Sequence, residues 1–303
     1  MTKAKRGAYA AAITPLDARG EPDADKLARY CRRLLERGLD GVAPIGTTGE
    51  GASVPMRFRL EAPAAFAEHG FRADEVIFGT GSCAVGDAVE ATRAVIGAGF
   101  ANVLVLPPFY FKNVSDEGLY AYYARLIESV GDARLRVYLY HFPQMSMTPI
   151  SIPLIERLKR DFGSAIAGLK DSSGDYEGTL AFARAAEEFD VFPSNEGVLL
   201  RAMAEGCAGV ISATTNAGPH IARRALDAEG EAAETAQALL GEVRALIAKH
   251  PLSPALKRLE AWRSGDEGWL ALLPPQIPLS VAAEQALRAD LEAIEPRAGL
   301  LGA

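Results

Sequence analysis

The sequence has few cysteines, few histidines and no long apolar segment. Its three cysteines, Cys31, Cys83 and Cys207, are widely spaced and form no CxxC motif, so we expect neither a disulfide framework nor a zinc cluster. The four histidines show no HxH or HExxH spacing, which argues against a metal site. No uninterrupted apolar run of about 18 residues occurs, so we expect no membrane span. These features favour a protein of the reducing cytoplasm.

Basic residues are also in the minority. Among 303 residues, 32 are Lys or Arg and 39 are Asp or Glu, which gives a formal net charge of −7. Proteins that bind nucleic acid or anionic membranes usually carry a basic face, so we expect neither partner. A single pocket can still bind a small anion. The first residues contain only a short apolar run that Pro15 and Asp17 interrupt, which is not typical of a signal peptide.

What the chain does contain is a regular alternation of short apolar runs and longer helical patterns. The runs are rich in Val, Ile and Leu, as in parallel strands that are covered on both faces. Eight strands that are each followed by a helix predict a (β/α)₈ barrel of the α/β class, with a doubly wound sheet as the alternative. The expected strands are Tyr9–Ile13, Gly41–Ile45, Val76–Gly79, Val103–Leu106, Leu135–Tyr140, Ala165–Lys170, Val191–Pro193 and Ala208–Ser212.

Several of the intervening segments carry helix boundary signals. Apolar residues recur in Pro22–Gly38 at the spacing of one helix face, and the final glycine supplies a stop. Ser115–Val130 begins with an N-cap serine that two acidic residues follow. Ser151–Phe162 places Pro153 in the first turn, where a missing N–H costs least. Each segment is therefore predicted to be a helix.

The last quarter of the chain shows only helical patterns. They occur in Glu231–Ala248, Pro254–Trp262 and Val281–Ile294. We therefore predict a barrel over residues 1–228 and a C-terminal helical extension over residues 229–303. The extension is expected to pack on the barrel or on a partner chain.

One lysine stands at the end of an apolar strand. Lys170 closes the sixth run, and burial in apolar surroundings disfavours the charged form of an amine. A neutral amine is what a Schiff-base nucleophile requires. The alternative is a lysine that reaches solvent or pairs with Asp171. The other seven lysines are expected in polar or amphipathic surroundings: Lys3, Lys5, Lys26, Lys112, Lys159, Lys249 and Lys257.

Two further groups fall at neighbouring strand ends. Tyr140 ends the fifth run, about 5 Å sideways from Lys170, where a phenol can move protons during catalysis; the alternative is an ordinary interior aromatic residue. The second run is followed by Gly46-Thr-Thr-Gly-Glu50. Its hydroxyls and backbone N–H groups suit a carboxylate, although a plain turn has the same composition.

These motifs occur together and in order. GTTGE after the second strand, Tyr140-His-Phe-Pro143 at the fifth and Gly168-Leu-Lys170 at the sixth resemble the dihydrodipicolinate synthase / N-acetylneuraminate lyase family of class I aldolases. The resemblance extends over about residues 8–300 and includes Pro107–Tyr110 and Gly209–Ser212.

The resemblance implies a role for each residue of the site. Lys170 forms an imine with the oxo group of a small 2-oxo acid, and no separate cofactor is needed. Tyr140 relays protons. Thr47 and Thr48, with Gly46, bind the substrate carboxylate, and Thr48 also links Tyr140 to the relay. Ile211 of the eighth strand is a further expected substrate contact.

Two departures from the family pattern bear on the substrate. The synthases of this family carry an arginine two residues after the proline of Tyr-x-x-Pro, where it binds the second carboxylate. Here that residue is Met145, and a thioether cannot bind a carboxylate bidentately. The synthases also bring a tyrosine across the subunit interface; here that position is Phe111, with Tyr110 beside it. Both differences argue against lysine-pathway synthesis.

Polar residues follow the seventh strand, where lyases of this family hold sugar hydroxyls. Ser194, Asn195 and Glu196 occupy that position and are candidate substrate contacts, or alternatively an N-cap for the next helix. His141 beside Tyr140 is interpreted as a strand residue with satisfied hydrogen bonds rather than a pocket residue.

We expect a lyase that cleaves or forms a C–C bond in a hydroxylated 2-oxo acid, with pyruvate as product or donor. Dehydration of a 2-oxo-3-deoxy sugar acid through the same imine is the alternative. A 4-hydroxy-tetrahydrodipicolinate synthase and a non-catalytic 2-oxo acid binding protein rank below both. The aromatic loop at residues 107–111 and the helical extension predict a homo-oligomer, a dimer of dimers.

Overall fold

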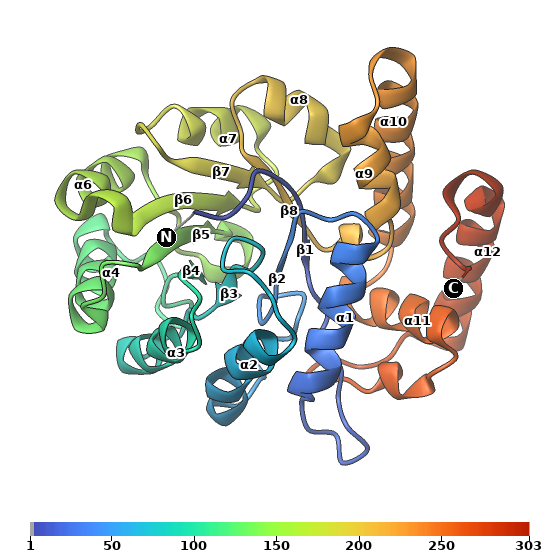
Figure 1. Cartoon of the computed structure of the whole chain (residues 1–303), viewed down its shortest axis with the longest axis horizontal. Helices are drawn as coiled ribbons and strands as arrows, with labels where there is room; N and C mark the ends of the chain where they lie inside the picture. Colours follow the sequence, from blue (N-terminus) through green and yellow to red (C-terminus); the bar gives the residue numbers. More distant parts are fainter. Residues whose placement is uncertain (1–2, 303) are drawn as a thin grey trace.

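The computed structural model describes residues 3–302, which form a closed parallel barrel surrounded by helices (Figure 1). The strands run in the order β2-β1-β8 and β3-β4-β5-β6-β7, and all pairs are parallel. These sets are joined on one side by a bridge between Val42 and Val76, and on the other by a 2.8 Å hydrogen bond from Ala208 N to Val191 O. The predicted (β/α)₈ barrel is confirmed. Its strands are β1 (Gly7–Ala11), β2 (Gly41–Ala43), β3 (Phe78–Gly79), β4 (Asn102–Val105), β5 (Arg136–His141), β6 (Ile166–Asp171), β7 (Asp190–Pro193) and β8 (Gly209–Ser212).

Helices cover the outside of the barrel. The two predicted serine caps are present, because Ser115 accepts a hydrogen bond from Gly118 N and Ser151 accepts one from Leu154 N. The covering helices are α1 (Ala24–Glu36), α2 (Met56–Glu68), α3 (Val85–Gly97), α4 (Asp116–Val130), α6 (Ile152–Phe162), α7 (Tyr176–Ala183), α8 (Leu199–Ala204) and α9 (Pro219–Asp227). The short helix α5 (Pro143–Ser146) follows β5 at the barrel mouth.

Two strands are shorter than the apolar runs indicate. β2 ends at Ala43 rather than Ile45, because Ile45 has a φ of 60° and begins a turn. β3 contains only Phe78 and Gly79, and the preceding Val76 makes a single bridge to β2. A prediction from apolar composition alone therefore made both strands too long, because the apolar residues continue into the neighbouring loops.

Three long helices follow the barrel: α10 (Gly230–Ile247), α11 (Leu252–Ser264) and α12 (Val281–Ala298). They lie on one side of the molecule near α1 and α9 (Figure 1). The segment between α11 and α12 reaches α1, where the ring centroids of Trp269 and Tyr30 are 4.9 Å apart. In this chain the extension thus packs on its own barrel.

The boundary between barrel and extension at residues 228 and 229 stays a prediction; it falls in the short link between the end of α9 at Asp227 and the start of α10 at Gly230. Residues 1, 2 and 303, the outer limits of the two predicted segments, lie outside the described residues. The helix α12 continues past the expected Ile294 through Pro296 to Ala298.

Side chains fill the barrel interior. Tyr9, Tyr138 and Phe192 form its aromatic layer, in which the ring of Phe192 meets Tyr9 at 5.7 Å and Tyr138 at 6.0 Å, edge to face. Tyr140 belongs to the same buried cluster. The interior is a packed core rather than a pore, so a substrate site can form only at a barrel end.

Candidate active site

The lysine and tyrosine predicted at neighbouring strand ends are in contact. Tyr140 of β5 and Lys170 of β6 are register partners, and the Lys170 Nζ atom donates a 3.3 Å hydrogen bond to the Tyr140 hydroxyl. Lys170 is 3% exposed and Tyr140 is 4% exposed. The parallel pairing of β5 with β6 places both side chains at the carboxyl ends of the strands, where barrel enzymes carry out their chemistry.

The surroundings of Tyr140 favour its ionised form. Burial by itself raises the pKa of the phenol, but the positive charge of Lys170 and hydrogen bonds with Thr47, Ser172 and Lys170 outweigh burial and lower the pKa below the usual value of 10.0. A phenol with a lowered pKa gives up and recovers a proton more readily near neutral pH. Tyr140 is therefore suited to proton transfer at the position of the Lys170 amine.

A second lysine is also buried, which the sequence analysis did not anticipate. Lys257 of α11 is 1% exposed, although its sequence surroundings predicted an amphipathic position. Its amine forms an ion pair with Glu50 and donates a 2.7 Å hydrogen bond to Ala271 O. Because these acceptors occupy the Lys257 amine, the lysine that faces the phenol remains the candidate nucleophile.

The turn Gly46–Glu50 meets the lysine and tyrosine pair through Thr47. The Thr47 Oγ1 atom lies 3.4 Å from the Tyr140 hydroxyl. The family resemblance implies this link for Thr48, whose carbonyl instead accepts a 2.8 Å hydrogen bond from Ser253 Oγ of α11. The contact with the phenol thus comes from the neighbouring threonine, because the turn directs the first hydroxyl toward β5. Carboxylate binding by Gly46, Thr47 and Thr48 stays a prediction.

This turn has an unusual backbone. Ile45 and Glu50, which bracket it, have φ values of 60° and 58°. Left-handed conformations cost about 1–3 kcal/mol at residues other than glycine and persist where the surroundings impose them. The turn is held by hydrogen bonds from Gly51 N to Gly46 O (2.9 Å) and from Thr14 Oγ1 to Gly49 O (2.7 Å). Strain of this kind is commonest at functional sites.

A cavity of about 250 Å³ opens beside Tyr140 and Thr47. Met145, at the position of the synthase arginine, lines it, and the Met145 side chain is 57% exposed. Arg59 is a cationic lining residue, but it donates to the backbone carbonyls of Gly51 and Gly81. Most of the remaining wall is apolar or backbone: Ile45, Gly46, Gly51, Gly79, Gly81, Leu104, Leu106, Phe109 and Pro275.

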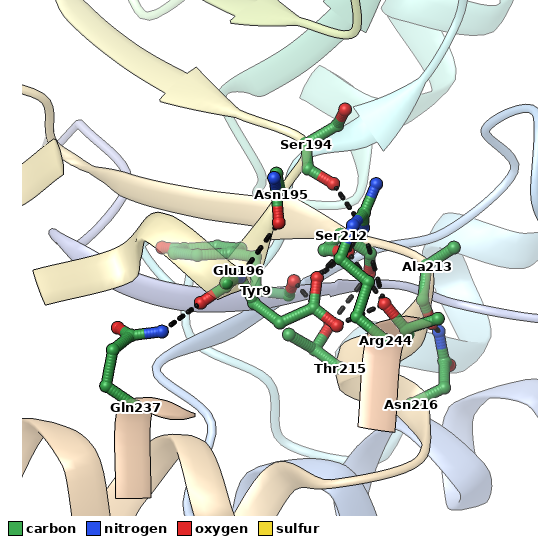
Figure 2. A network of polar contacts seen from close by, with 12 residues as sticks. Tyr9, Ser194, Asn195, Glu196, Ser212, Ala213, Thr215, Asn216, Gln237 and Arg244 are labelled. Atoms are coloured by element: carbon green, nitrogen blue, oxygen red, sulfur yellow. Dashed lines mark hydrogen bonds and ion pairs between the residues drawn. The ribbon is translucent and has the colours of Figure 1, made fainter. Parts of the chain in front are cut away.

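The polar residues after β7 belong to a hydrogen-bond network between β7, β8 and α10 (Figure 2). The Glu196 carboxylate is 1% exposed and accepts hydrogen bonds from Ser212 Oγ (2.5 Å), Thr214 Oγ1 and Arg244 Nη1 (3.0 Å). These donors satisfy the carboxylate within the protein. Arg244 of α10, which the sequence analysis did not select, is the cation that compensates the charge.

Asn195 has the capping role that the sequence analysis kept as an alternative. Its side chain accepts a 2.9 Å hydrogen bond from Gly197 N at the start of the short 3₁₀ helix η2 (Glu196–Val198). Ser194 is half-buried, and its carbonyl accepts a 2.9 Å hydrogen bond from Arg244 Nη1. Substrate contacts by Ser194, Asn195 and Glu196 stay predictions.

Ile211 and His141 are both buried beside the site. Ile211 pairs with Tyr9 of β1 and belongs to the interior cluster that contains Tyr140; its contact with substrate stays a prediction. The His141 Nδ1 atom accepts a 3.0 Å hydrogen bond from Ile150 N, and burial lowers the pKa of the imidazole. His141 is thus a strand residue with a satisfied ring nitrogen, as interpreted from the sequence.

Tyr110 and Phe111 lie on the surface. They are 76% and 56% exposed, and their rings meet edge to face at 5.7 Å. Neither residue has a described contact with Tyr140 or Lys170 of its own chain. A part in the proton relay would therefore need a second subunit, and that role stays a prediction.

Two kinds of feature are not found in residues 3–302. The His, Cys, Asp and Glu side chains form no group of three or more that could hold a metal ion. No helix in this part of the chain combines the length and the apolar character needed to cross a bilayer.

Known proteins are similar to this chain in sequence and in architecture. Residues 4–294 match the model of the dihydrodipicolinate synthetase family. An uncharacterized DapA-like lyase of Chloroflexus aurantiacus is 38% identical over 95% of this chain and 97% of its own length. A 4-hydroxy-tetrahydrodipicolinate synthase of Thermus thermophilus is 34% identical over 70% of this chain and 69% of its own. The crystal structure of dihydrodipicolinate synthase from Agrobacterium tumefaciens superposes with a TM-score of 0.85 at 30% identity, covering 95% of this chain and 99% of that one. The chain therefore belongs to the dihydrodipicolinate synthetase family and is a lyase of the class I aldolase type.

Proposed function

We propose that this lyase cleaves a hydroxylated 2-oxo acid into pyruvate and an aldehyde through an imine on Lys170, in the cytoplasm. The observation that carries the proposal is the chain of contacts from Lys170 Nζ to the Tyr140 hydroxyl (3.3 Å) and from there to Thr47 Oγ1 (3.4 Å). It joins an amine, a phenol with a lowered pKa and a hydroxyl of the turn that precedes α2.

In the proposed reaction, Lys170 passes its proton to the ionised Tyr140, the amine attacks C2 of the 2-oxo acid, and the oxo oxygen leaves as water. The backbone N–H groups and hydroxyls at Gly46–Thr48 hold the carboxylate. Tyr140 supplies a proton for the departing oxygen and, once ionised, accepts the proton of the C4 hydroxyl. The C3–C4 bond then breaks, the aldehyde leaves, and the electron pair is held as an enamine. Protonation at C3 and hydrolysis by water release pyruvate and regenerate the amine.

Lysine-pathway synthesis fits the site less well. Met145 stands where the synthases carry an arginine, and a thioether offers a carboxylate neither a charge nor a hydrogen-bond donor. Because the Met145 side chain is 57% exposed, solvent screens this position, and the missing contact costs less than the roughly 2–5 kcal/mol of a fully buried charge pair. We therefore expect only weak condensation of pyruvate with aspartate semialdehyde, and a rate typical of metabolic enzymes in that assay would contradict the assignment.

The central experiment is reductive trapping. The protein is incubated with pyruvate and borohydride, and the intact chain and its peptides are weighed by mass spectrometry. We expect one reduced pyruvyl adduct, on Lys170, and none in Lys170→Arg, because a guanidinium stays charged and cannot act as the nucleophile. An adduct on Lys257 or elsewhere, or none with pyruvate or any other 2-oxo acid tested, would overturn the proposal.

A product assay then separates cleavage from dehydration. Hydroxylated 2-oxo acids are supplied as a panel, and pyruvate release is followed. Release of pyruvate with an equal amount of aldehyde supports retro-aldol cleavage. Loss of water with the carbon chain intact would show that the same imine serves a dehydratase, while no turnover by a protein that traps pyruvate would indicate a 2-oxo acid binding protein.

A further inference from the structure

One face of helix α11 contacts the turn Gly46–Glu50 directly. Ser253 and Lys257 are four residues apart on α11, so they project from the same side of the helix. Ser253 Oγ donates a 2.8 Å hydrogen bond to Thr48 O, and the Lys257 amine forms an ion pair with the Glu50 carboxylate. The other Glu50 oxygen accepts a 2.5 Å hydrogen bond from Leu273 N, in the segment that follows α11.

These contacts are almost inaccessible to solvent. Ser253 is 4% exposed, Glu50 3% and Lys257 1%. A buried ion pair adds little stability over a well-packed apolar pair, because desolvation of both charges offsets their attraction. In some proteins such a pair instead fixes one arrangement of the chain, because displacing either partner leaves a buried charge uncompensated.

The turn needs an outside constraint of this kind. Glu50 itself has a φ of 58°, as Ile45 has one of 60° at the other end. A strained backbone relaxes when the contacts that impose it are removed. Relaxation at Glu50 and Thr48 would displace the neighbouring Thr47, whose hydroxyl lies 3.4 Å from that of Tyr140.

We propose that Ser253, Lys257 and Glu50 are positioning residues, which hold the turn Gly46–Glu50 so that its hydroxyls and N–H groups meet the carboxylate of a 2-oxo acid on Lys170. This inference rests on the proposed Schiff-base function. It gives the C-terminal extension a part in substrate binding, although the three residues are not expected to touch the reacting atoms.

The test uses the concentration dependence of trapping by pyruvate and borohydride, which needs no knowledge of the natural aldehyde. Ser253→Ala removes one hydrogen bond, and we expect the pyruvate concentration for half-maximal trapping to rise about three- to tenfold. In the double variant Glu50→Leu/Lys257→Met, which replaces the pair with apolar groups of similar size, we expect a rise of at least about tenfold. The maximal trapping rate should fall by a smaller factor than this concentration rises in both variants, because Lys170 is unchanged and Tyr140 loses only its contact with Thr47.

Two controls make the test specific. Lys26→Met breaks the 2.6 Å ion pair between Lys26 of α1 and Asp266, which joins the extension to the barrel without contacting the turn. In this variant we expect the pyruvate concentration for half-maximal trapping to equal that of the wild type, even if the free energy of unfolding falls. Ser253→Thr keeps a hydroxyl, so its pyruvate concentration for half-maximal trapping should return most of the way to the wild-type value.

The outcomes separate this inference from the proposed function. If the wild-type chain traps no 2-oxo acid, the Schiff-base function itself fails. If the wild-type chain is trapped and folded Ser253→Ala needs no more pyruvate than wild type, the positioning role is overturned. A rise in Lys26→Met as large as in Ser253→Ala would likewise overturn it, since general loosening of the extension would then be the cause.

Discussion

At the scale of single residues, the two buried lysines differ in their partners. Lys257 faces a carboxylate and a carbonyl, which hold a cation in place. Lys170 faces a phenol whose own pKa is lowered. The apolar run that ends at Lys170 predicted its burial, whereas the helical pattern around Lys257 did not, because its partner Glu50 lies two hundred residues away in sequence. Contacts of such long range leave no local signal.

Tyr140→Phe tests the phenol as a proton-transfer group. The ring and its packing are kept, so folding should change little. Proton transfer by a positioned group is worth typically 10²–10⁴-fold in rate, so we expect kcat to fall by at least about a hundredfold with a much smaller change in KM. Steady-state kinetics on a cleaved 2-oxo acid measure both.

The pH profile provides a second readout for the same change. Because the pKa of Tyr140 is lowered from 10.0, ionisation of the phenol should appear in the wild type as a limb of the plot of kcat against pH, at a pH below 10. The limb should be absent in Tyr140→Phe. A variant with near-normal kcat would show that the phenol only packs, and the relay would then have to involve Thr47 or Tyr110.

At the scale of elements, the strands were predictable and the turns were not. Apolar runs located all eight strands, and the nearness of Tyr140 to Lys170 followed from the predicted adjacency of β5 and β6. The run through Ile45 gave no sign that this β-branched residue has a positive φ. The family resemblance likewise implies that Thr48 links to Tyr140, whereas the hydroxyl near Tyr140 is that of Thr47. The direction of a side chain in a tight turn depends on backbone angles, which composition does not encode.

Gly168→Ala tests the close approach of β6 to β7. A Cβ atom at Gly168 would lie 2.0 Å from Asp190 O, a backbone atom of the neighbouring strand. Since neither strand can move without disturbing the barrel, we expect the free energy of unfolding to fall by more than about 2 kcal/mol. Urea unfolding followed by circular dichroism measures the change.

The matched control for this variant is Gly86→Ala in α3. A Cβ atom at Gly86 would have no neighbour within 4 Å, so the change should be neutral or stabilising by up to about 1 kcal/mol. Equal stability of the two variants would show that the barrel accommodates a side chain at Gly168 and would contradict the prediction.

At the scale of the whole molecule, an exposed apolar patch lies at one end of the barrel. The mouth patch consists of Tyr110, Phe111, Met145 and Met147, which are 50–76% exposed. Hydrogen bonds from Asn113 N to Met147 O (3.0 Å) and from Thr148 Oγ1 to Phe111 O (3.2 Å) join its two loops. Contiguous exposed apolar side chains of this kind commonly mark a protein interface.

We expect the chain to form a homo-oligomer, a dimer of dimers, that buries the mouth patch. Light scattering at micromolar concentration should give about four times the chain mass of 32.2 kDa. Phe111→Glu should shift the mass toward smaller species, because it places a charge in the apolar contact. A mass equal to that of one chain in the wild-type protein would refute the prediction.

Stability should decrease in mildly acidic solution. Burial lowers the pKa of His141 and of His220 below the usual 6.5, so the folded state disfavours their protonated forms. Below about pH 6.5 the unfolded chain binds more protons, and the free energy of unfolding falls as the pH falls; above that pH these groups have no effect.

Urea unfolding at pH 7.5 and pH 5.5 measures this dependence. His141→Asn keeps an acceptor for Ile150 N but does not titrate, so its loss of stability between the two pH values should be smaller than that of the wild type. An unchanged pH dependence in His141→Asn would show that His141 does not contribute.

The contact between α11 and the turn Gly46–Glu50 also bears on the order in which the chain is made. A ribosome synthesises residues 46–50 early, but their partners at Ser253, Lys257 and Leu273 emerge some two hundred residues later. The candidate nucleophile Lys170 and the phenol of Tyr140 are likewise synthesised well before helix α11, which contacts the turn. A nascent chain can therefore carry Lys170 and Tyr140 on formed strands while the turn still lacks its final contacts, so the end of synthesis is also the step that completes the site.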